Sequence, residues 1–139
     1  MMLARCHGLA ITSATVAAKL HGFVGARALV ELLDDLRAEA DQTRSRCLLV
    51  EGGDEELAHA NSTAATGLDL LDAWFKADTD PVEAWTFLVM VEAAEVAAWK
   101  ALAATANGEV AELAAWALPL HERHLDAALG AVKELVRIP

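Results

Sequence analysis

A chain of 139 residues, 55% of them hydrophobic, fits one domain of ordinary size, and we expect a single domain over 1–139. Its formal net charge of −10 argues against binding to nucleic acid or to anionic membrane surfaces, which requires clustered Lys and Arg. Alanine, leucine and glutamate are abundant, tyrosine is absent, and β-branched residues do not alternate as in strands. The composition therefore predicts an all-α domain.

The cysteine content indicates the compartment. Cys6 and Cys47 form neither a CxxC motif nor a dense disulfide framework. Two thiols without such a pattern suit a reducing environment. No stretch is apolar and long enough to be a candidate membrane-spanning helix. We therefore expect a cytoplasmic protein.

Helix breakers divide the chain into four predicted helices. The first covers about 11–46, which is roughly 50 Å of helix and long for a compact bundle of this mass. Gly22 and Gly25 are its candidate bend points. The break at 52–53 separates it from a second helix over about 54–76.

The second predicted helix has an apolar stripe on one side only, so Asp69 and Asp72, on the other side, are expected in solvent. Glu56-x-x-His59 copies the spacing of a di-iron half-motif. It lies in the first turns of the helix and off the apolar stripe, so we interpret it as a solvated helix start. His7, close to the chain terminus, is expected at the surface.

The third and fourth helices form a predicted hairpin. Asp80-Pro81 supplies an N-cap and a proline at the first position of a helix over 81–106. Asn107-Gly108 ends that helix, and the fourth follows over about 109–136. So short a connection makes the two helices antiparallel neighbours.

The third helix is apolar nearly all round, which is typical of a helix buried on every side. Glu92 and Glu95 nevertheless occupy core positions of its 3-4-3-4-3 seam of Trp85, Leu88, Glu92, Glu95, Trp99 and Leu102. A buried carboxylate costs several kcal/mol unless it is paired or bound to a metal ion. Both glutamates therefore require a partner.

The fourth helix offers that partner. His121 and His124 fall on its apolar face, at the heights of Glu95 and Glu92 when positions are counted outward from the turn. Spacing of i,i+3 places each pair on one helix face. Carboxylate and imidazole together are the usual ligands of iron, manganese or zinc, so we predict these four residues as metal ligands.

Two other interpretations of the four residues stay open. They can form a hydrogen-bonded Glu–His network without metal, or a different helix rotation can leave one glutamate in solvent. Elsewhere the chain has no Gly-rich phosphate loop, no Ser-His-Asp set and no reactive Cys-His pair. We predict no organic cofactor, and the sequence leaves catalytic residues and enzyme activity undetermined.

The segments Val91–Trp99 and Leu118–Leu125 resemble the second half of ferritin-like proteins. The resemblance implies a ferritin-like, up-down four-helix bundle. Di-iron members of that family place one Glu on each of two helices and Glu-x-x-His on each of the other two. Glu92 or Glu95 matches the lone Glu of the third helix, and His124 matches the His of the fourth-helix motif.

The chain departs from the family pattern in two places. His121 stands where the fourth-helix motif has Glu, and the first half has no Glu-x-x-His at mid-bundle height. A degenerate ferritin-like protein or a single metal site therefore fits better than a complete di-iron centre in one chain. A homodimer could complete a site by bringing two hairpins together.

The predicted function is thus a ferritin-like protein that binds iron, manganese or zinc. The alternative is a metal-free helical bundle that acts as an oligomeric interaction protein. The all-round apolar third helix favours a homodimer, and Trp116, near the polar face of its helix, is the best single candidate for a subunit contact. Metal content separates the two functions.

Overall fold

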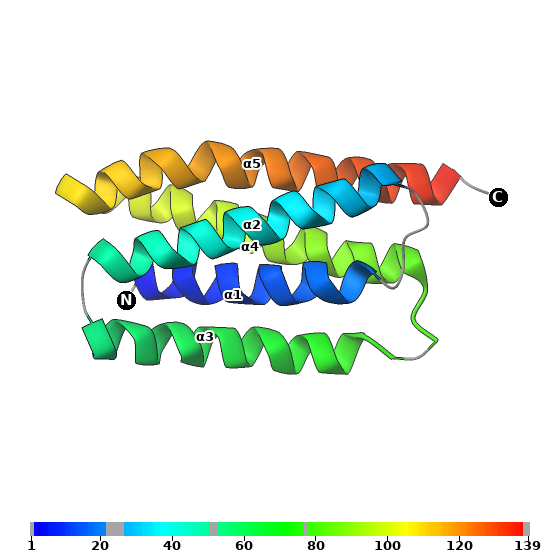
Figure 1. The fold of residues 1–139 in the computed structure, drawn as a ribbon, viewed down its shortest axis with the longest axis horizontal. Helices are drawn as coiled ribbons and strands as arrows, with labels where there is room; N and C mark the ends of the chain where they lie inside the picture. The colour runs from blue at the N-terminus through cyan, green and yellow to red at the C-terminus, as the bar shows by residue number, and fades with distance from the viewer. Residues whose placement is uncertain (1, 22–26, 51–52, 77, 138–139) are drawn as a thin grey trace.

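The computed structural model describes residues 2–21, 27–50, 53–76 and 78–137, without the side chains of 27–29, 53, 54 and 56 (Figure 1). These residues form five α-helices and no strand: α1 (Met2–Leu20), α2 (Arg27–Val50), α3 (Gly53–Trp74), α4 (Pro81–Thr105) and α5 (Gly108–Arg137). The all-α prediction is confirmed, and the count of four helices is wrong. No helix of the described segments has the length and hydropathy needed to cross a membrane.

The error lies in the first predicted helix. The range 11–46 is divided between α1 and α2, which run antiparallel and pack along their lengths (Figure 1). Each helix has a buried stripe at 3-4 spacing that would stay exposed on a single rod, so folding back buries both. The stripes are Leu3, Cys6, Ala10, Ser13, Ala17 and Leu20 on α1, and Leu33, Leu36, Ala40, Thr43 and Cys47 on α2. The candidate bend points Gly22 and Gly25 lie outside the described residues.

Four helices surround a common interior. α1 packs on α2 and α4, and α5 packs on α4 and α2, which closes the ring. α3 lies on the other side of α1 (Figure 1). Two glycines allow that close approach, because a Cβ at Gly8 would stand 2.5 Å from the Ala60 carbonyl oxygen and one at Gly67 would stand 2.5 Å from Thr12 Oγ1. The ring itself is therefore formed by α1, α2, α4 and α5, and α3 adds Leu71 to the apolar core from outside the ring.

The predicted hairpin of α4 and α5 is confirmed. Asp80 Oδ1 accepts a hydrogen bond from Val82 N at 2.7 Å, and Pro81 opens α4. Gly108 has a φ of +57° at the turn, which glycine adopts without steric cost. The two helices then pack closely along their lengths, so residues at equal distances from the turn face one another.

The core has two apolar layers. Toward the α4–α5 turn lie Leu3, Cys6, Cys47, Trp99, Leu102, Leu113, Ala114 and Ala117. Toward the other end lie Val16, Leu20, Leu33, Leu36, Leu71, Trp85, Leu88, Val91 and Ala128. On α1, α2, α4 and α5 the residues between the two layers include buried polar side chains. A polar layer therefore crosses the middle of the ring.

Candidate metal centre

Glu92 and Glu95 of α4 and His121 and His124 of α5 form this polar layer, called here the Glu/His cluster. All four side chains are buried. Glu95 Oε2 lies 3.2 Å from His121 Nδ1, and Glu92 Oε2 lies 3.8 Å from His124 Nδ1. Glu95 therefore lies opposite His121 and Glu92 opposite His124, as predicted by counting from the turn. Neither glutamate faces solvent.

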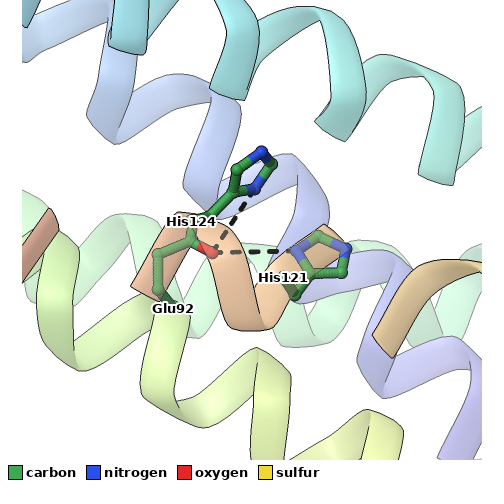
Figure 2. Close-up of side chains that lie close together, drawn as sticks. All are labelled: Glu92, His121 and His124. Carbon is green, nitrogen blue, oxygen red and sulfur yellow. Dashed lines mark ion pairs between the residues drawn. The ribbon is translucent and has the colours of Figure 1, made fainter. Parts of the chain in front are cut away.

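Three of the four residues converge on one point. Glu92 Oε2 lies 3.7 Å from His121 Nδ1 as well as 3.8 Å from His124 Nδ1 (Figure 2). A ligand atom from each of these three side chains lies within 4.8 Å of the other two. An ion with ligand distances of about 2.0–2.2 Å holds tetrahedral ligands about 3.3–3.6 Å apart. The three residues can therefore hold a metal ion after small rotations, with Glu95 beside His121.

Two helices that the sequence did not connect with the site also reach it. Ser13 of α1 donates a 2.5 Å hydrogen bond from Oγ to Glu92 Oε1, which leaves Oε2 to face the histidines. From α2, Glu39 Oε2 contacts His124 Nε2, and Thr43 Oγ1 lies 3.4 Å from His121 Nε2. Each of the four helices in the ring therefore contributes a side chain.

The α2 contacts indicate which nitrogen of each imidazole carries hydrogen. Thr43 Oγ1 donates to the carbonyl oxygen of Glu39 at 2.9 Å, so toward His121 Nε2 the hydroxyl is an acceptor. Glu39 Oε2 contacts His124 Nε2, and because a carboxylate has no hydrogen to donate, this contact favours a hydrogen on Nε2. In neutral rings both Nδ1 atoms then carry lone pairs directed at Glu92. Outer carboxylate and hydroxyl partners of this kind orient metal-binding histidines.

Several buried atoms of the cluster have no hydrogen-bond partner among the described residues: Glu92 Oε2, both carboxylate oxygens of Glu95, and His121 Nδ1. They lie within ion-pair distance of one another without alignment for a hydrogen bond. Buried polar atoms are normally paired, because desolvation without a partner costs several kcal/mol. A proton or a metal ion between these atoms satisfies them.

The electrostatics of the cluster favour a positive charge in it. Burial and the negative charge of Glu92 raise the pKa of Glu95 to about 8. Burial by itself would lower the pKa of His121, but the charges of Glu95 and Glu92 outweigh it and raise that pKa to about 10. Burial lowers the pKa of His124, against the opposing effect of Glu92 and Glu39. His124 is thus neutral, and His121 holds a proton that a metal ion would have to displace.

We expect an unusual pH dependence of stability in the metal-free protein. The folded-state pKa values of Glu95 and His121 lie above those of the unfolded chain, so the stability they contribute is lost as pH rises through about 8 and about 10. Urea unfolding in a chelator at pH 6.5, 8 and 9.5 should give a falling free energy of unfolding. Metal binding requires deprotonated ligands and should strengthen over the same range. A metal-free protein that gains stability from pH 6.5 to 9.5 would contradict the charge assignment.

The ring of Trp99 fixes the orientation of His121 on its remaining side. The two rings are stacked, with an interplanar angle of 9° and centroids 6.1 Å apart. Trp116, the predicted subunit contact, is half-buried and lies under the guanidinium of Arg46, 4.0 Å from the ring centroid. That cation–π contact within the chain covers part of the indole.

The other histidine and acid predictions have mixed outcomes. His7 is fully buried, so its prediction as a surface residue is wrong: α1 begins at Met2 and not at about residue 11. His59 is exposed, as predicted, and its Nε2 lies 3.9 Å from Glu55; the side chain of Glu56 lies outside the described residues. Asp69 and Asp72 are exposed, as predicted.

No family model, no curated protein and no solved structure matches the chain.

Proposed function

We propose that this protein binds one divalent transition-metal ion in its interior, through Glu92 Oε2, His121 Nδ1 and His124 Nδ1, with Glu95 as a fourth ligand. The observation that carries the proposal is that ligand atoms of three buried residues converge from α4 and α5, while side chains of α2 contact the far nitrogen of each imidazole. A purely structural pair would need one donor for each acceptor. Here Glu92 Oε2, both carboxylate oxygens of Glu95 and His121 Nδ1 are all buried without a hydrogen-bond partner among the described residues.

Iron, manganese and zinc are the ions that this ligand set suits, because imidazole binds iron and zinc well and carboxylate suits manganese and iron. Two His and one carboxylate with open positions are also the ligand set of non-haem Fe(II) sites. We place the protein with degenerate ferritin-like proteins. The support is the position of the Glu/His cluster, midway along the antiparallel helices. Its proposed ligands lie on α4 and α5, and side chains of α1 and α2 contact these ligands from outside. Oxygen or peroxide would meet a redox-active ion inside the bundle.

The test is metal binding by the untagged protein and two histidine variants. After chelation, anaerobic dialysis against Fe(II), Mn(II), Zn(II) or Co(II) should give one ion per chain. At a hundredfold excess over Kd, binding adds about 2.7 kcal/mol, on the order of 10 °C in Tm for a chain of this length. His124→Leu should abolish both effects. His59→Leu is the matched control, because it removes an exposed histidine and should change neither.

A second candidate function is the metal-free interaction protein. The raised pKa of His121 favours it, because a protonated ring can balance the nearby carboxylates without an ion. In that case no ion binds after anaerobic loading, and Tm stays unchanged for the wild type. The same dialysis therefore decides between the two functions.

We extend the proposal to a homodimer formed through the outward face of α4. Met90 is 50% exposed, and Ala94, Ala97 and Ala101 continue its uncharged stripe along the helix. The three alanines border a groove of about 450 Å³, whose other side is lined by α1 and by Thr63 of α3. The −10 charge of the chain does not fall on this stripe, so a second copy can approach without opposing acids. Light scattering should give twice 14.8 kDa, and Ala97→Glu should give 14.8 kDa. A monomeric wild type would contradict the dimer.

A further inference from the structure

One residue connects the buried cluster to solvent. Among the described side chains that contact the cluster, Glu39 is 29% exposed, while the side chains of His124, His121 and Glu92 are 7%, 1% and 0% exposed. Its Oε2 atom is itself buried against His124 Nε2, so the exposure belongs to the rest of the side chain. Glu39 therefore spans from the surface to a proposed ligand.

Glu39 lies on the seam between α2 and α5, which pack together less extensively than α4 and α5 or α1 and α2. Along this face of α2, residues four apart become progressively buried. Asp35 is exposed, Glu39 is partly buried, and Thr43 is fully buried beside His121. Glu39 and Thr43 thus place side-chain oxygen atoms against the two histidines, and Glu39 is the one of this pair that reaches solvent.

We propose that metal ions enter the Glu/His cluster along this seam, and that Glu39 is the entry ligand that receives the ion and transfers it past His124. The inference rests on the proposed function. A carboxylate is a suitable first ligand for a hydrated divalent ion, and local negative charge raises the rate of encounter with cations. Glu92 and Glu95 have no exposed atoms, so an ion that arrives from solvent cannot contact them first.

An entry role and a positioning role predict different kinetics. If Glu39 only orients His124, its loss weakens the site and the ion dissociates faster at an unchanged association rate. If Glu39 lowers the entry barrier, its loss slows association and dissociation together and leaves Kd nearly constant. Glu39→Gln separates the two cases, because the Gln carbonyl oxygen still accepts from His124 Nε2.

The experiment is stopped-flow Co(II) binding, followed by the absorption of the bound ion, with dissociation measured by chelator competition. Glu39→Gln should lower both rate constants about tenfold or more. Asp41→Asn is the control, since it removes the same charge from an exposed position of α2 outside the seam and should leave both rates unchanged. An unchanged association rate in Glu39→Gln, or equal slowing in both variants, overturns the entry role while the metal site stands. A wild type that takes up no Co(II) overturns both.

Discussion

Replacing His121 with leucine should destabilise the metal-free protein by about 3–5 kcal/mol, the usual cost of leaving a buried charge without its partner. His121 Nδ1 is the positive group nearest to Glu95 Oε2, at 3.2 Å, and it also faces Glu92 Oε2 at 3.7 Å. Without the imidazole, α5 no longer places a proton donor next to these two carboxylate oxygens. Metal binding should disappear as well. Urea unfolding in a chelator at pH 9, where Glu95 is ionised and His121 is still protonated, measures the first effect, and Co(II) titration measures the second.

The matched control for this variant is His59→Leu. His59 is exposed and only 3.9 Å from an exposed Glu55 on the same helix, so its loss should change stability by less than about 0.5 kcal/mol. A loss below about 1 kcal/mol in His121→Leu would mean that the two glutamates are already neutral or paired elsewhere. In that case, the free energy of unfolding of His121→Leu should fall no more steeply with rising pH than that of the wild type.

The second half of the chain could be predicted closely because its signals are local. An N-cap at Asp80, the Asn107-Gly108 turn and the buried seam of α4 determine which residues of α4 and α5 face each other. Two charged residues in an apolar seam are then conspicuous, since burial of unpaired charge is costly. Glu92 and Glu95 were found for that reason.

The contributions of α1 and α2 could not be predicted in the same way. Ser13 lies in an alanine-rich helix, where a serine alone indicates no role, and its partner Glu92 is 79 residues away. Glu39 carries a weak signal, because it continues the 4-3-4 spacing of Leu32, Leu36 and Thr43, yet a charged residue beside an apolar stripe usually lies in solvent. The seam with α5 decides its position, and no local pattern encodes that seam.

Removing Glu95 and His121 together should largely restore the stability that His121→Leu loses. A buried ion pair replaced as a unit by apolar side chains of similar volume is often neutral or stabilising by about 1–4 kcal/mol, because two desolvation costs vanish with one attraction. Glu92 keeps the Ser13 hydrogen bond, and His124 keeps Glu39. We therefore expect the Glu95→Leu, His121→Leu double variant to unfold, in a chelator at pH 9, at a urea concentration close to that of the wild type. It should bind no Co(II), and its stability should no longer fall between pH 8 and 10. This outcome would indicate that the two residues are kept at a cost to the metal-free fold, as a binding site requires. A double variant as unstable as His121→Leu would instead support a structural network in which Glu95 and His121 contribute to the fold itself.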